Sequence, residues 1–150
     1  MIPVFICHIC DGKENCELAI KIMEKLRRDI KNIEVFIACQ DNRWSNAKDL
    51  NTILDRCYFF VPIISNSFPD RRNCCAELTQ AKTRQKQNTK FPIIRPVRYH
   101  CDLELMKELG FAIDQVNETG VLWEDFSQDE KFESSYQKFY KRIYGAILDN

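Results

Sequence analysis

A run of apolar residues in the middle of the chain constrains the fold more than any other feature. It extends from Tyr58 to Ile64, so both faces of the strand that it predicts are apolar. Such strands are typical of parallel sheets that have helices packed on both faces. A segment with helical character follows from Asn73 to about Gln87, and the pair predicts a strand–helix unit of an α/β protein.

The same alternation of strand and helix runs along the rest of the chain. Further strands are predicted over residues 2–7, 33–39 and 91–97, with a weaker candidate over 121–123. Helices are predicted over residues 18–30, a short segment ending near 55, 103–109 and 132–147. We therefore expect one domain over residues 1–150, with a central and mainly parallel sheet of five strands. Pro92 and Pro96 make the fourth strand an edge candidate, because proline lacks the N–H that a sheet ladder uses.

Composition and charge exclude several classes of protein. The chain has 22 basic and 22 acidic residues, and this balance gives no general attraction to nucleic acid or anionic lipid. A local basic cluster, Arg71–Arg72 with residues 82–90, is interpreted as a solvated helix face. No apolar run is long enough to span a membrane, and the first strand lacks the features of a signal peptide. We expect a cytoplasmic protein that neither inserts into a membrane nor binds nucleic acid.

The eight cysteines are interpreted as reduced and mostly buried thiols. Cys7, Cys39 and Cys57 lie in or beside predicted strands. Cys7 and Cys10 have a C-x-x-C spacing, which leaves a zinc site or a thioredoxin-like redox pair as alternatives. No second pair of this kind occurs and Asp11–Gly12 precedes the helix, so we expect no metal site. Glycine-rich phosphate-binding motifs are absent from the sequence, which argues against a Rossmann dehydrogenase or a nucleotide triphosphatase.

Glu77 lies close to the predicted start of the helix that follows the central strand. The carboxyl ends of parallel strands and the starts of the following helices meet at one edge of the sheet, where open α/β proteins bind ligands. A carboxylate at this place is either an ordinary charge at a helix start or the working group of a site. We expect the helix dipole to favour its ionised form by about 0.3–1 kcal/mol.

Four segments, in this order, resemble the TIR domain family, the Toll/interleukin-1 receptor and resistance-protein module. Val4–His8 resembles the family's opening strand, and Val35–Ile37 resembles its second strand. Val61–Ser65 resembles the third strand and its exit, and Cys74–Leu78 resembles the signature tryptophan-cysteine-x-x-glutamate-leucine. The likeness covers residues 2–100 best. It implies a flavodoxin-like three-layer fold.

The resemblance implies two kinds of function. Some family members cleave NAD at the nicotinamide–ribose bond, as hydrolases or ADP-ribosyl cyclases, in defence or immune signalling, and act when they self-associate. Others are non-catalytic adaptors that assemble with further TIR domains. By resemblance, Glu77 is the catalytic residue of the first kind, NAD is its substrate, and no other cofactor is implied. Asn73 stands where many members carry the tryptophan, and this difference favours the second kind.

The resemblance and the strand ends together suggest a nucleotide-binding set. Its members are His8, Asp41, Arg43, Trp44, Ser65, Asn73 and Cys74. Several have a simpler interpretation: His8 as a histidine with satisfied hydrogen bonds, Ser65 as a turn residue, and Asp41 and Arg43 as solvated loop charges. Trp44 could stack on a base or lie in an assembly interface. Another flavodoxin-like enzyme that acts on nucleosides, such as a deoxyribosyltransferase, stays open because unrelated functions share this architecture.

Overall fold

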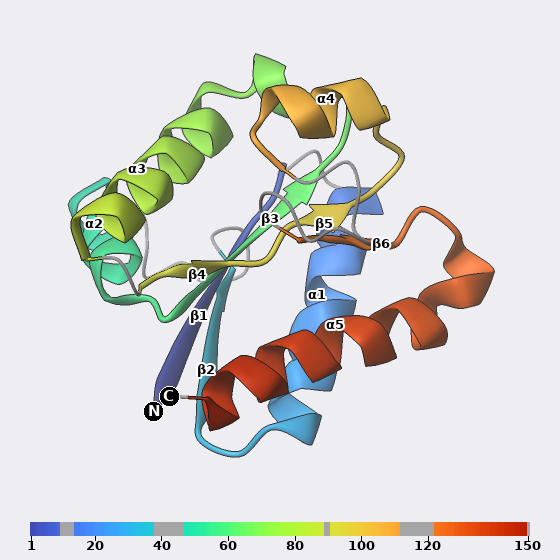
Figure 1. Ribbon diagram of the computed structural model, residues 1–150, viewed down its shortest axis with the longest axis horizontal. Helices are drawn as coiled ribbons and strands as arrows, with labels where there is room; N and C mark the ends of the chain where they lie inside the picture. Colours follow the sequence, from blue (N-terminus) through green and yellow to red (C-terminus); the bar gives the residue numbers. More distant parts are fainter. Residues whose placement is uncertain (10–13, 38–46, 89–90, 112–121, 150) are drawn as a thin grey trace.

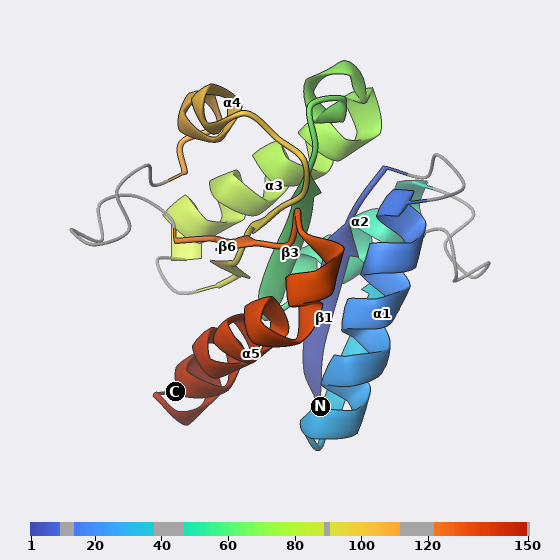
Figure 2. The ribbon, with the colours of Figure 1, turned by 90° about the vertical axis from the view of Figure 1, so that its right-hand side faces the viewer.

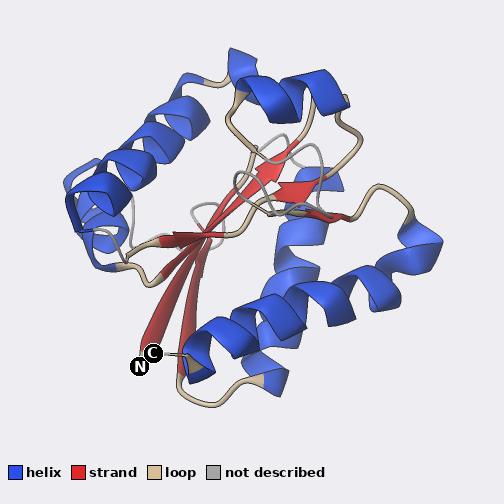
Figure 3. Cartoon of the chain, viewed as in Figure 1, coloured by secondary structure: helices blue, strands red, loops and turns tan. Residues whose placement is uncertain are grey.

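The computed structural model describes residues 1–9, 14–37, 47–88, 91–111 and 122–149. Its helices are α1 (Glu14–Asp29), α2 (Ala47–Arg56), α3 (Arg72–Asn88), α4 (Leu103–Glu108) and α5 (Phe132–Leu148). Two short 3-10 turns, η2 (Phe68–Asp70) and η3 (Asp129–Lys131), precede α3 and α5. The chain forms three layers, with α1 and α5 on one face of a central sheet and α2 and α3 on the other (Figures 1 and 3).

The described part of the sheet has six strands. They are β1 (Ile2–Cys7), β2 (Ile33–Ile37), β3 (Phe59–Ile64), β4 (Ile93–Ile94), β5 (Val97–Arg98) and β6 (Glu124–Asp125). Their order is β2-β1-β3-β5-β6, with β4 also paired to β3, and these pairings are all parallel. With β4 and β5 taken as two pieces of one interrupted strand, this is the flavodoxin-like order 2-1-3-4-5. The expected fold class and the mainly parallel sheet are confirmed.

Alternate residues of β1 face opposite helix layers. Val4 and Ile6 belong to the core that includes α1 and α5, whereas Phe5 and Cys7 belong to the core that includes α2 and α3. This alternation is the two-residue period of a strand. All six residues of β3 are buried, which confirms that helices cover both faces of the central strand.

The fourth strand differs from its prediction. Two short strands, β4 and β5, replace the single strand predicted over 91–97; they are separated by Arg95 and Pro96, and β5 extends to Arg98. Proline cannot donate to a sheet ladder, and this accounts for the interruption. The expectation that this strand forms an edge is wrong for β5, which lies between β3 and β6.

The last strand was predicted in the wrong place. Strand β6 occupies Glu124–Asp125, whereas Leu122 and Trp123 are not in a strand and Val121 lies outside the described residues. Glu124 is only 8% exposed, and its carboxylate forms an ion pair with Arg142 of α5. A buried carboxylate requires such a partner. The ion pair therefore allows Glu124, a charged residue, to lie inside the fold.

The basic cluster on α3 is less solvated than predicted. Arg71 and Arg72 are exposed, but the Arg84 guanidinium is half-buried and donates to the carbonyl oxygens of Leu54 and Cys57, at 2.9 and 2.6 Å. Lys82 donates to a carbonyl oxygen at the end of α4. These cations satisfy the last carbonyls of neighbouring helices, which is a structural role.

Helix α4 ends at Glu108, one residue before the end that the sequence predicts. Gly110 has a φ of 87°, the left-handed conformation that favours glycine, and it lies two residues beyond the last residue of the helix. The Phe111 N–H donates to the Met106 carbonyl oxygen at 2.9 Å and so closes the helix end.

Among the helices that the structure describes, none is both long enough and apolar enough to cross a membrane.

Candidate functional site

The candidate site lies where β1 and β3 end. Cys7, the last residue of β1, pairs with Pro62 of β3, so the two parallel strands reach the same edge of the sheet. Helices α1 and α3 begin close to this edge (Figure 2). Each of His8 and Ser65 follows its strand by one residue, as the sequence predicts. This is the edge at which open α/β folds bind ligands.

Sulfur contacts hold the start of α3 against the end of β1. The Cys7 Sγ lies 3.9 Å from the Cys74 carbonyl oxygen, and the Cys74 Sγ lies 3.5 Å from the His8 carbonyl oxygen. Both thiols are buried. Thiols are weak donors, so these bonds add little energy individually, but they show that the strand end and the helix start are in direct contact. His8 and Cys74, which are both members of the predicted binding set, are therefore neighbours.

The His8 side chain packs toward α1. It is 6% exposed, and its Nε2 lies 3.5 Å from the Sγ of Cys16. Cys16 also contacts the Ile9 carbonyl oxygen at 3.9 Å. This arrangement supports the simpler interpretation, a buried histidine that contacts a protein side chain, and contact with a nucleotide stays a prediction.

Glu77 lies beside the buried end of β1. Cys74 and Glu77 are three residues apart on α3 and so share one face of the helix. Cys7 is the neighbour of both, since its thiol contacts the Cys74 carbonyl oxygen and lies near enough to the Glu77 carboxylate for a hydrogen bond between them to affect the pKa of each group. The Glu77 side chain is half-buried. The structure thus places one carboxylate at the ligand edge, next to a thiol.

Burial raises the pKa of the Glu77 carboxyl, and the hydrogen bond with Cys7 partly opposes this rise. Burial also raises the pKa of the Cys7 thiol, with the contacts to Cys74 and Glu77 acting in the same direction. The expectation that the helix start favours the ionised form of Glu77 is wrong. The helix begins at Arg72, so Glu77 lies in the second turn, beyond the reach of the dipole effect.

Comparison with known proteins identifies the family. The model of the TIR domain family matches residues 4–140. The chain belongs to the TIR domain family. Curated protein sequences contain no match. The TIR domains of the activated Roq1 resistosome, which directly recognizes the pathogen effector XopQ, form a similar structure with a TM-score of 0.52. That match has 16% identity over 95% of this chain and 73% of the other, so the likeness shows the fold alone.

Two further members of the predicted binding set lie at this edge of the TIR domain. Ser65 is 9% exposed, and its carbonyl oxygen accepts the Phe68 N–H at 3.0 Å, as expected of a turn residue. The Ser65 Oγ is buried and makes no hydrogen bond within the described segments. Asn73 is exposed in the first turn of α3, at the position where many TIR domains carry tryptophan. A nucleotide contact by either residue stays a prediction.

Other predictions concern residues outside the described segments. Asp41, Arg43 and Trp44 all lie there. So does Cys10, one half of the C-x-x-C pair that suggested zinc. Among the described residues, no group of three or more His, Cys, Asp or Glu side chains is arranged to hold a metal ion. The six described cysteines are all free and most are buried, as the sequence predicts.

The contact between Cys7 and Glu77 was missed by sequence reasoning. Cys7 was considered only as a buried thiol and as half of a C-x-x-C pair. The useful signal was its place as the last residue of a predicted parallel strand, on the same side as Phe5. Its partner lies 70 positions away, so the sequence offered no local spacing that would connect the two.

Proposed function

We propose that this TIR domain cleaves the nicotinamide–ribose bond of NAD, as a hydrolase or an ADP-ribosyl cyclase, when several copies assemble. The biological role of this NAD cleavage would be in defence signalling within the cytoplasm. The observation that carries the proposal is the half-buried carboxylate of Glu77 at the carboxyl edge of a TIR sheet. A poorly solvated carboxylate interacts more strongly with a developing positive charge than a fully hydrated one does.

The reaction needs little more than such a carboxylate. The bond between ribose C1′ and the pyridinium nitrogen breaks, and its electron pair stays on the nitrogen, so neutral nicotinamide leaves without protonation. Positive charge develops on the ribose ring, as in other glycosyl transfers. Glu77 would stabilise this cation and accept hydrogen bonds from the ribose hydroxyls. Water attack at C1′ gives ADP-ribose and a proton, whereas attack by a nucleophilic atom of the ADP-ribose part gives a cyclic product.

Neighbouring groups could hold the rest of the substrate. The first N–H groups of α3 lack partners within the helix and are suited to a phosphate, with the exposed Arg71 and Arg72 beside them. The buried Ser65 hydroxyl is available to a substrate polar group. Asn73, Cys74 and His8 lie next to these groups, and we assign them to the nucleotide-binding set.

A non-catalytic TIR module that signals by assembly with other TIR domains is the second candidate. Asn73 favours it, because an exposed amide replaces the aromatic ring on which nicotinamide could stack. The two candidates make different predictions about the fate of NAD, whereas both predict self-association.

The test is a dilution series with NAD as substrate. The full chain is incubated with NAD from dilute to concentrated and crowded solution, nicotinamide and ADP-ribosyl products are separated by chromatography, and assembly is followed by light scattering. We expect nicotinamide release per protein molecule to rise as assembly rises. Assembly with no loss of NAD would refute the enzyme and support the adaptor.

The pH dependence of NAD cleavage should report the environment of Glu77. Only the ionised carboxylate stabilises a cation, and burial raises its pKa. The acid limb of the pH–rate profile is therefore expected above the ordinary glutamate value of about 4.3. Rates measured from pH 4 to 8 at constant ionic strength would show it. A midpoint at or below the ordinary value would contradict the role of a half-buried carboxylate.

The Cys7 thiol should act as a positioning group for Glu77. Removing it in Cys7→Ala deletes one hydrogen bond to the carboxylate, and we expect a rate lower by about two- to tenfold. The acid limb should also move to higher pH, because that hydrogen bond lowers the pKa of Glu77. Cys7→Ser is the matched control: its hydroxyl donates in the same place, so both the rate and the acid limb should return toward those of the parent. A serine variant that behaves like the alanine variant would exclude this role.

A further inference from the structure

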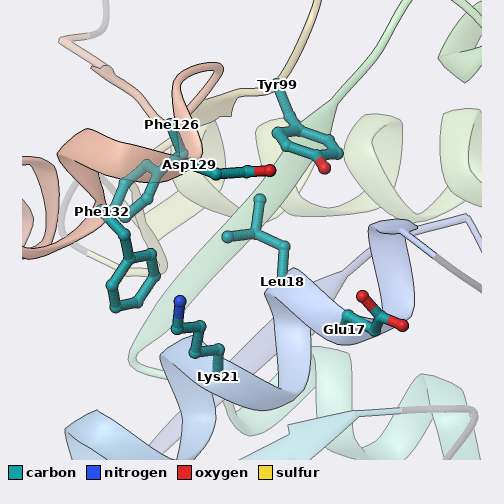
Figure 4. Close-up of a pocket in the computed structure, with 7 residues that line it drawn as sticks. All are labelled: Glu17, Leu18, Lys21, Tyr99, Phe126, Asp129 and Phe132. Carbon is teal, nitrogen blue, oxygen red and sulfur yellow. The ribbon is translucent and has the colours of Figure 1, made fainter.

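A hollow lies on the opposite face of the sheet from Glu77. It is a cavity of about 330 Å³ between the first turns of α1 and the segment that leads from β6 into α5 (Figure 4). Its lining residues are Glu17, Leu18, Lys21, Tyr99, Phe126, Asp129 and Phe132. Leu18 and Phe126 belong to the core that includes α1 and α5, whereas Cys7 and Cys74 at the Glu77 site belong to the other core. The two sites are therefore physically separate.

The floor of this cavity is formed by four buried side chains, three of which are wholly apolar. Leu18, Tyr99, Phe126 and Phe132 are each at most 8% exposed. The Phe126 and Phe132 rings pack with their centroids 5.7 Å apart, tilted by 59°. Such a floor suits an aliphatic or aromatic group of a small ligand, and the volume lies at the lower end of the range for small-molecule sites.

The rim carries charges of both signs. Glu17, Lys21 and Asp129 are exposed, and none of the three forms an ion pair within the described segments. The Lys21 Nζ lies over the Phe132 ring, 4.0 Å from its centroid, so its ammonium covers that part of the floor. In Figure 4 the Asp129 carboxylate extends toward Tyr99, across the cavity. Two anions and one cation thus surround one apolar surface.

This combination selects the charge of a ligand. A purely cationic ligand cannot pair with the Lys21 ammonium, and a purely anionic one cannot pair with the Glu17 and Asp129 carboxylates. A zwitterion with an apolar side chain can use rim charges of both signs and the floor. The ligand's ammonium pairs with Glu17 or Asp129, the ligand's carboxylate pairs with Lys21, and the ligand's side chain covers the floor.

We propose that this cavity binds a free α-amino acid with an aromatic or large aliphatic side chain. The site would be independent of NAD cleavage in its chemistry, because it contains none of the residues assigned to that reaction. Its place against α1 and α5 means that an occupant would contact both helices of one layer at once.

The test uses three probes that share one ring and differ in charge. L-Phenylalanine is the zwitterion, phenethylamine the cation and 3-phenylpropionate the anion. Each is titrated into the ¹⁵N-labelled full chain, and amide shifts are followed by NMR. We expect saturable shifts with L-phenylalanine at residues 17–21, 99 and 126–132, with a dissociation constant below about 1 mM. The two singly charged probes should bind at least about tenfold more weakly.

Asp129→Asn should weaken the binding of L-phenylalanine about tenfold, because it removes one charge-assisted contact and leaves the exposed side chain's shape unchanged. Glu130→Gln is the control, since it neutralises the adjacent residue of η3, which does not line the cavity. It should bind as the parent does. Absence of saturable shifts, equal binding of the three probes, or no effect of Asp129→Asn would each overturn the proposal. None of these outcomes depends on whether the chain cleaves NAD.

Discussion

Glu77→Gln is expected to lower the rate of NAD cleavage by the assembled protein at least about 100-fold. The substitution keeps the size of the side chain and its ability to accept a hydrogen bond. It removes the negative charge that opposes the cation forming on the ribose ring. The loss should appear in the rate at saturating NAD and not in the apparent affinity, because the charge matters most in the transition state.

The stability of the same variant provides the control. The pKa of Glu77 is raised in the folded protein, so the fold favours the protonated form, and the parent loses stability as the pH rises through that raised pKa. Glutamine is neutral throughout. We therefore expect Glu77→Gln to unfold at a similar urea concentration to the parent in acid, and at a higher one at neutral pH. A variant that has lost activity and is also less stable at neutral pH would indicate a structural role for the carboxylate.

Phe60→Ala should be the most damaging single change to the fold among those considered. Phe60 is completely buried in the core that includes α2 and α3, and its ring stacks on that of Phe5 with centroids 5.9 Å apart and planes 7° apart. Removing the ring leaves a cavity between the central strands and the helix layer of α2 and α3. The free energy of unfolding should fall by about 3–5 kcal/mol, measured by urea denaturation.

Leu148→Ala is a suitable reference for that measurement, because Leu148 is 68% exposed at the end of α5. Its effect should stay within about 0.5 kcal/mol. If Phe60→Ala were as mild as Leu148→Ala, the central strands would not be packed as described. Since the site of Glu77 rests on the same core, Phe60→Ala is also expected to impair NAD cleavage.

Patterns that repeat along the chain predicted the architecture well. The run from Tyr58 to Ile64 is apolar on both faces, and β3 is buried on both faces. Gly110 ends α4 because few other residues tolerate its backbone conformation. These features depend on local chemistry, which the sequence displays directly.

Features that depend on distant partners were predicted less well. Strand β6 has only two residues, and one of them, Glu124, is a carboxylate buried through its ion pair with Arg142. No residue near Glu124 in the sequence indicates that Arg142 is its partner. The pKa of Glu77 likewise depends on packing against the end of β1, and a helix start was assumed where the structure has a second turn.

The candidate site also combines features that the sequence predicted with features that depend on distant partners. The expected topology of a parallel sheet was enough to predict that His8 and Ser65 lie at one edge. The contact between Cys7 and Glu77 joins residues far apart in the chain and required the fold. The cavity with Glu17 and Asp129 on its rim is assembled from three separate segments, so no motif in the sequence could mark it.

Nicotinamide release is the measurement that tests the central claim most directly. Parent and Glu77→Gln proteins, both concentrated and crowded, are incubated with NAD, and nicotinamide and the ADP-ribosyl product are quantified together. We expect the parent to release one nicotinamide for each NAD lost, with linear or cyclic ADP-ribose as the other product, and the variant to release almost none. Intact NAD with both assembled proteins, or equal release by both, would contradict the assignment of Glu77 as the catalytic residue.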